Sequence, residues 1–168
     1  MAIQVEKRLS AGQVVGAGRD LTRLATLPGI GADSTVALTD DAEATAAAPA
    51  ETAGVVDLVV DYLWGRAAGD AITALLRARA DRSRALNWIQ IGSMAGPTIE
   101  LPLVAPRSVD FRLQGNGQGA VSTRGYLAEL PSLIEEIDGR GIAVTARTMP
   151  LADVGAAWTE PECRYAPC

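Results

Sequence analysis

The sequence predicts an α/β fold in which helices flank a parallel sheet. Short apolar runs alternate with stretches of helical spacing along the 168 residues, which is typical of strand–helix–strand units. One run, Val55–Asp61 (VVDLVVD), is almost continuously apolar, as expected for a strand that helices cover on both faces. Hydrophobic residues make up 48% of the chain, so its 17.5 kDa suffice for a substantial core.

The N-terminal half is expected to alternate helices and strands. Val5 and Leu9 lie one helical turn apart, and Ala11-Gly12 ends that helix. Asp20 is a plausible N-cap for the next helix, which Pro28-Gly29 interrupts. The expected elements are a helix over Ile3–Ser10, a strand over Gln13–Gly18, a helix after Asp20, a strand over Ser34–Leu38, an alanine-rich helix over Asp40–Thr52 and the strand Val55–Asp61.

The second half continues the same alternation. The expected elements are a helix over Gly65–Arg79 with Ile72, Leu75 and Leu76 turned inward, strands over Leu86–Ile91 and Val109–Leu113, a helix that carries Tyr126, Leu130, Leu133 and Ile137, a strand over Ala143–Thr148 and a short helix over Leu151–Trp158. Pro131 is expected to break or kink the long helix. The glycines of GNGQG, Gly115–Gly119, predict a flexible turn.

Composition and charge exclude several function classes. The net charge of −5 argues against a nucleic-acid surface, which needs a basic face. No apolar run approaches the ~18 residues of a membrane span, and the charged N-terminus does not resemble a signal peptide. A cytoplasmic location is therefore expected. The chain has no histidine, which excludes histidine-dependent triads and metal sites, and Cys163 and Cys168 are expected to be free thiols.

Ligands of open parallel sheets bind beyond the carboxyl ends of the strands. Small or polar residues stand at three such ends, in Gly18-Arg19, Tyr62–Trp64 and Gly92-Ser93. The sequence therefore predicts a nucleotide crevice along this edge of the sheet.

The glycine stretch Gly16-Ala17-Gly18 allows two registers. It could be the phosphate turn after a first strand, with Asp40 about 20 residues on as the ribose-binding acid. Alternatively it ends the second strand, where a small residue followed by arginine leaves room for a 2′-phosphate and pairs with it. Gly18-Arg19 fits this second pattern, and Arg23 lies one turn further along.

In the second register the chain resembles the medium-chain dehydrogenase/reductase superfamily, in its zinc-free, quinone oxidoreductase-like branch. The resemblance rests on four segments and runs from about Ala2 to Trp158: VVGAGRDLTRLATLPGIGADSTVALTD, DLVVDYLWG, WIQIGSMAGPTIELP and IAVTARTMPLADVGAAW. It implies an incomplete Rossmann-like sheet in which the first strand and its glycine-rich turn are missing. It also implies a truncated NADP-binding domain over residues 1–141 and, over 142–168, a remnant of the catalytic domain plus a tail.

The resemblance implies site residues and partners as well. Gly18, Arg19 and Arg23 would hold the adenosine 2′-phosphate of NADP(H), Leu63 would lie beside the nicotinamide ribose, and Gly92 and Ser93 would approach the nicotinamide. No catalytic or metal-binding residue is expected, and the substrate would be a small quinone or enone. The Asp110–Gly119 segment would be an edge strand that pairs across a homodimer.

The missing strand leads to expectations about function. Several unpaired buried backbone groups, at about 1–3 kcal/mol each, would consume most of a domain stability of about 5–15 kcal/mol. We expect a marginally stable chain that binds NADPH weakly. One hypothesis is therefore an NADPH-dependent quinone or enone reductase that is inactive as this chain alone. The alternatives are a non-catalytic truncated remnant and a small nucleotide-binding module that prefers NAD through Asp40.

Overall fold

The computed structural model describes residues 1–39, 56–117, 119–139, 141–143 and 148–159. The predicted helix Asp40–Thr52 lies outside the described residues, as do Cys163, Cys168 and most of the predicted strand Ala143–Thr148. Within the described ranges, none of the helices has the length and apolarity that crossing a bilayer requires.

The N-terminal residues form a two-stranded parallel sheet with short helices. Helix α1 (Ala2–Arg8) leads into strand β1 (Val15–Gly18), and helix α2 (Leu21–Leu24) and a 3-10 turn (Leu27–Ile30) lead into strand β2 (Ser34–Ala37). The two strands pair in parallel from Val15 with Ser34 to Gly18 with Ala37. The predicted strands and the predicted capping role of Asp20 are confirmed, because its carboxylate accepts hydrogen bonds from the N–H groups of Thr22 and Arg23.

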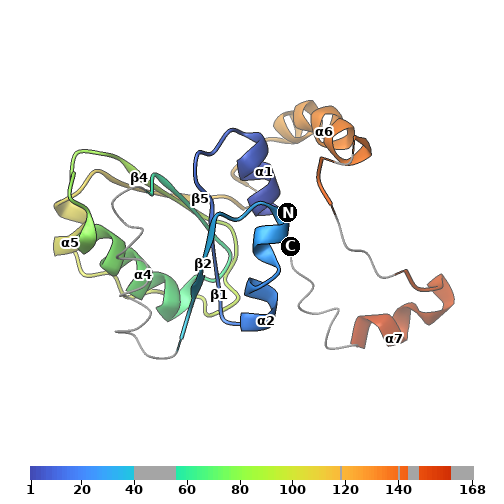
Figure 1. Cartoon of the computed structure of the whole chain (residues 1–168), viewed down its shortest axis with the longest axis horizontal. Coiled ribbons are helices and arrows are strands. Elements are labelled where there is room, and N and C mark those ends of the chain that lie inside the picture. Colours follow the sequence, from blue (N-terminus) through green and yellow to red (C-terminus); the bar gives the residue numbers. More distant parts are fainter. Residues whose placement is uncertain (40–55, 118, 140, 144–147, 160–168) are drawn as a thin grey trace.

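A second, three-stranded sheet holds most of the core. Strands β3 (Leu58–Asp61), β4 (Leu86–Gln90) and β5 (Phe111–Gly115) pair in parallel in that order, with helix α4 (Gly65–Ala78) and the short helix α5 (Val104–Arg107) beside them (Figure 1). Ile72, Leu76 and Leu86 are fully buried, and Trp88 joins their cluster. The inward face predicted for Gly65–Arg79 is therefore confirmed.

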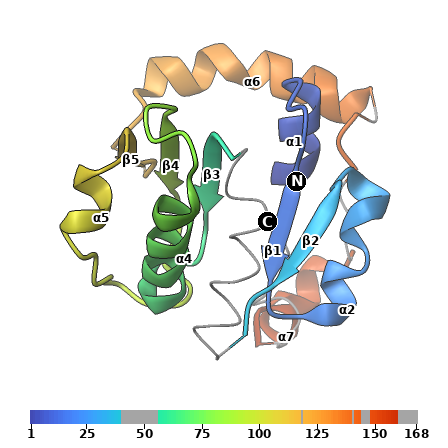
Figure 2. The same cartoon turned by 60° about the vertical axis from the view of Figure 1, so that its left-hand side comes forward.

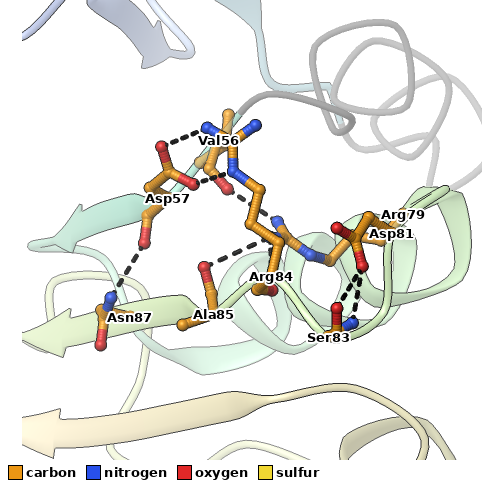
Figure 3. Close-up of polar contacts among 8 residues, drawn as sticks. All are labelled: Val56, Asp57, Arg79, Asp81, Ser83, Arg84, Ala85 and Asn87. Carbon is orange, nitrogen blue, oxygen red and sulfur yellow. Dashed lines mark hydrogen bonds and ion pairs between the residues drawn. The ribbon is translucent and has the colours of Figure 1, made fainter.

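A buried arginine ties the amino ends of β3 and β4 to the end of α4. Arg79 is 4% exposed, and its guanidinium donates hydrogen bonds to the main-chain carbonyls of Val56, Arg84 and Ala85 at 2.7, 2.7 and 3.2 Å (Figure 3). Arg84 in turn forms an ion pair with Asp57, whose hydrogen bonds lower the pKa of that carboxyl below its ordinary 3.8. This network lies at the end of the sheet opposite the predicted ligand crevice.

The two sheets lie next to each other with their strands running in the same direction (Figure 2). Read across the molecule, the order is β2-β1 followed by β3-β4-β5. A doubly wound dinucleotide-binding sheet has the order 3-2-1-4-5-6, so the observed strands match positions 3, 2, 4, 5 and 6. No strand of the described residues occupies position 1, in agreement with the predicted incomplete sheet.

Helix α6 (Thr123–Asp138) is continuous through Pro131, so the break considered there is wrong. The Ser122 side chain accepts a hydrogen bond from the Gly125 N–H and caps its start. Its apolar side chains are all exposed, from 39% at Leu133 to 62% at Leu127. The helical spacing was read correctly, but within the described residues nothing buries this face.

Two smaller predictions need correction. The strand predicted over Val109–Leu113 begins at Phe111 and extends to Gly115, so the first glycine of GNGQG ends the strand instead of opening a turn. Helix α5 was not predicted, because its four residues are too few to show a period. The last predicted helix is confirmed as a 3-10 turn (Leu151–Asp153) followed by α7 (Val154–Thr159).

Candidate functional site

Two turns interlock at the carboxyl ends of β3 and β4. The carbonyl of Leu63 accepts a hydrogen bond from the Ala95 N–H at 2.7 Å, and the carbonyl of Tyr62 accepts one from Met94 at 3.3 Å. Trp64 and Gly96 then form an isolated parallel bridge. The turn after β3 and the turn after β4 therefore form one unit.

A buried carboxylate holds this unit to the core. Asp61 is the last residue of β3 and is 6% exposed. Its Oδ1 accepts hydrogen bonds from the N–H groups of Leu63 at 2.8 Å and Trp64 at 3.0 Å. Its Oδ2 accepts one from the indole Nε1 of Trp88 at 3.0 Å. Because a buried carboxylate is costly unless hydrogen-bonded, these three donors are what allow Asp61 to stay there.

Close backbone packing explains the small residues of the turns. A Cβ at Gly92 would lie 2.6 Å from the carbonyl oxygen of Tyr62, so only glycine fits there without a shift. Gly65 has φ +63° and a similar contact with Ala95 at 2.7 Å. Trp64 has φ 53° and ψ −155°, a region that glycine usually occupies. This backbone strain marks the turn after β3 as a constrained segment.

The other predicted residues lie at the carboxyl end of β1. Gly18 ends the strand, and Arg19 follows in an exposed position. Arg23 lies on α2 and forms an exposed ion pair with Asp20 at 3.4 Å. A Cβ at Gly18 would meet only the Leu24 side chain, at 3.6 Å. This position is therefore less restricted than Gly92, since that contact is of ordinary van der Waals length.

The six predicted residues fall into two groups on two sheets. Leu63, Gly92 and Ser93 belong to the interlocked turns, whereas Gly18, Arg19 and Arg23 belong to the β1–α2 turn. Figure 2 places both groups at the same end of the strands. The six residues thus lie along one edge of the strands, in two separate clusters. Asp40, the acid of the alternative register, lies outside the described residues.

Sequence reasoning overlooked Asp61 as an organising residue of the site. The available signal was an acid directly after the apolar run VVDLVV, at the carboxyl end of a buried strand. Trp88, which makes the third of the hydrogen bonds to Asp61, is in the core at 2% exposed. The sequence gives no sign that its indole N–H donates a hydrogen bond to Asp61.

The residues present fit parts of a dinucleotide. Gly18 is small, and Arg19 beside it offers a guanidinium for a phosphate. Gly92 lets the turn after β4 pack directly against the backbone of Tyr62 in the turn after β3. Within the described ranges, no cluster of three histidine, cysteine, aspartate or glutamate side chains is suited to a metal ion.

Comparisons with known proteins place the fold among known ones. No protein-family model matches the chain. It is 23% identical, over 97% of its length and 48% of the relative's, to the "Probable NADPH-dependent quinone reductase tdiC" of Emericella nidulans. A mycobacterial quinone oxidoreductase structure matches 96% of the chain and 49% of its own, with a TM-score of 0.74 and 20% identity. A mycobacterial structure complexed with NADPH matches 86% of this chain and 43% of its own chain, with a TM-score of 0.67 and 19% identity.

The chain spans about half the length of these relatives. Its order of strands and its flanking helices agree with their Rossmann-like fold. Over nearly its whole length, the chain is therefore similar to one half of a quinone oxidoreductase-like protein of the medium-chain dehydrogenase/reductase superfamily.

Proposed function

We propose that the chain binds NADPH as the cofactor-binding part of a zinc-free reductase whose substrate is a quinone or an α,β-unsaturated carbonyl compound. The observation that carries this proposal is the shared edge at the carboxyl ends of β1, β3 and β4, with an arginine at one turn and Gly92, packed closely against Tyr62, at the other. The similarity to an NADPH-dependent quinone reductase supports it.

In this proposal the β1–α2 turn binds the adenosine end of the cofactor. Gly18 leaves room for the 2′-phosphate, and the guanidinium of Arg19 forms charge-assisted hydrogen bonds with it. Arg23 lies one helical turn away and adds positive charge, although Asp20 offsets part of it through their ion pair. Positive charge at this turn favours NADPH over NADH.

The interlocked turns bind the nicotinamide end. Leu63 packs beside the ribose, and the backbone at Gly92 and Ser93 approaches the ring. When bound, NADPH supplies the hydride, and the quinone takes that hydride and a solvent proton to give a hydroquinone. The chain's own part is to orient the ring, because the Asp61 hydrogen bonds fix the turn that contacts it.

We expect little or no turnover from the chain by itself. The two groups of cofactor-binding residues lie on separate sheets, and catalysis needs both ends of the cofactor held in one geometry. The alternatives, a non-catalytic truncated remnant and a small nucleotide-binding module, lead to the same expectation. Oxidation of NADPH with a simple benzoquinone, measured on the purified chain, tests it, and sustained turnover would contradict it.

Titration calorimetry tests the binding step. The chain is titrated with NADPH and with NADH, and we expect weak binding with a preference for NADPH. Arg19→Glu should remove that preference by placing negative charge beside the phosphate. Arg124→Glu on the remote helix α6 is the matched control and should leave the preference unchanged. Equal affinity for the two cofactors, unchanged by Arg19→Glu, would contradict the proposal.

A homodimer through Asp110–Gly119 forms a second part of the proposal. The N–H of Leu86 donates to the Asp110 carbonyl and that of Asn116 to the Gln90 carbonyl, so the even-numbered residues of β5 face β4. Leu113 lies between them and directs its backbone groups to the other edge of β5. Light scattering should find a dimer, and Leu113→Pro should reduce it to a monomer without removing a hydrogen bond to β4.

A further inference from the structure

The facing edges of the two sheets carry backbone groups that no described strand satisfies. In a parallel ladder, alternate residues direct both their N–H and C=O groups to the same side. The carbonyl of Gly18 accepts from the Leu38 N–H and that of Val14 from Asp33, so the even-numbered residues of β1 face β2. Val15 and Ala17 therefore direct their groups away from β2.

The edge of β3 has the same arrangement. The carbonyls of Asp57 and Asp61 accept hydrogen bonds from Asn87 and Ile91 at 2.8 Å, so the odd-numbered residues face β4. Leu58 and Val60 direct their backbone groups to the opposite side, where Figure 2 places β1. Each of the two facing edges thus presents the backbone N–H and C=O groups of two residues, and the two strands run in the same direction.

The side chains at these positions lack the protection that free edges usually have. Natural edge strands carry charges, prolines or bulges that prevent pairing. Val15, Ala17, Leu58 and Val60 are all apolar, and Leu58 is 43% exposed. By contrast, the outer strand β5 carries Arg112, which pairs with Asp110. The facing edges therefore have the composition of paired central strands.

We propose that the edges of β1 and β3 bind one parallel strand of a polypeptide other than this chain, which joins the two sheets into one. The occupant is defined by the edges: it is extended, runs parallel to β1 and β3, and pairs on both sides over about four residues. Its sequence is apolar throughout, because a central parallel strand is covered on both faces. The order of strands leaves one position for it, between β1 and β3.

The bound strand would also complete the ligand edge. Because it runs parallel, its carboxyl end would lie between Gly18 at the end of β1 and Tyr62 after β3. Those positions belong to the two groups of site residues that the separate sheets hold apart. The inference stands without the proposed function, because it concerns backbone pairing alone.

Hydrogen exchange measured residue by residue tests the inference. The probe is a blocked peptide of about ten residues, with five consecutive valines or isoleucines, a Gly-Ala-Gly turn and two terminal lysines for solubility. Added to the full chain, it should slow exchange at the N–H groups of Val15, Leu58 and Val60 by at least about tenfold and raise the melting temperature. The same peptide with proline at its central position should do neither.

Two proline variants of the chain form a matched pair. Ala17→Pro removes an N–H that points to the proposed strand, whereas Thr35→Pro removes one that points away from β1 on the outer edge of β2. Neither takes part in a hydrogen bond between β1 and β2, so the two should cost similar stability. Circular dichroism checks that each variant folds. Peptide protection should be lost in Ala17→Pro and kept in Thr35→Pro.

Three results would overturn the inference. One is a lack of protection at both edges with a folded chain. Another is protection that Ala17→Pro leaves intact, because the peptide would then bind elsewhere. The third is protection of the same amides without peptide, which would show that the chain fills the position itself. If that protection rises with protein concentration, the occupant is a second copy; if it does not, the occupant is a segment of the same chain.

Discussion

The hydrogen bond between Asp61 and Trp88 gives the sharpest test of how the core organises the candidate site. Asp61→Asn keeps one oxygen for the N–H groups of Leu63 and Trp64, but it presents an amide donor to the indole N–H at 3.0 Å. Two donors then face each other in a buried position. An unsatisfied buried group costs about 1–3 kcal/mol, so we expect a loss of that size in the free energy of unfolding.

Trp88→Phe breaks the same interaction from the other side. It leaves an Asp61 oxygen without a donor and also loses part of a side chain that is only 2% exposed. In the double variant the phenyl ring no longer opposes the amide, so the two losses should not add. We expect a coupling energy of about 1–2 kcal/mol in a double-mutant cycle. Urea unfolding followed by far-ultraviolet circular dichroism measures it without relying on tryptophan fluorescence.

Asp110→Asn is the control, because it removes an exposed carboxylate paired with Arg112 and should change stability by no more than about 0.5 kcal/mol. Losses from Asp61→Asn and Trp88→Phe that add within about 0.5 kcal/mol would refute the reasoning, since independent sites behave in that way. If Asp61 and Trp88 are coupled but their substitution leaves hydrogen exchange at the Leu63 and Trp64 amides unchanged, the interaction stabilises the core without organising the turn.

Three further predictions concern the rest of the molecule. Arg79→Met should lower the free energy of unfolding by about 2–4 kcal/mol, because it orphans three carbonyls; exposed Arg77→Met on the same helix should do little, as judged by urea unfolding. Gly92→Ala should cost about 1–3 kcal/mol through its contact with a carbonyl, whereas Gly115→Ala has open space and should cost little in thermal melting. Asp57 has a lowered pKa in the folded chain, so its ion pair should stabilise the protein above pH 3.8 by at most about 1 kcal/mol and lose that effect as the pH falls further; Asp57→Asn should be less stable only above that pH.

The strands were predictable because each carries its own signal. The run VVDLVV is apolar on both faces, Gly18 is the last residue of β1, and Gly92 follows two residues after the end of β4. The helix Gly65–Ala78 was predictable for the same reason, since its inward residues repeat at the helical period. These patterns are local, and a local pattern predicts the observed element wherever tertiary contacts favour the same structure.

The pairwise contacts of the site were not predictable in this way. Asp61 and Trp88 are 27 residues apart, and nothing in either segment says that a carboxylate and an indole N–H will meet. The close approach of Gly92 to Tyr62 depends likewise on how two neighbouring strands pair. Strand order could be inferred from the chain's resemblance to a known fold, but such contacts between distant segments required coordinates.

Helix α6 shows how an apolar pattern predicts a helix without predicting its burial. Leu127, Leu130, Ile134 and Ile137 lie at helical spacing, yet each is at least 41% exposed. The unprotected edges of β1 and β3 present apolar residues in the same way. The chain gains little stability from either surface while that surface stays in water, because the hydrophobic contribution requires removal of apolar area from solvent. An apolar pattern in the sequence therefore does not by itself say which surface will be buried, and the peptide-exchange experiment examines the edges of β1 and β3 directly.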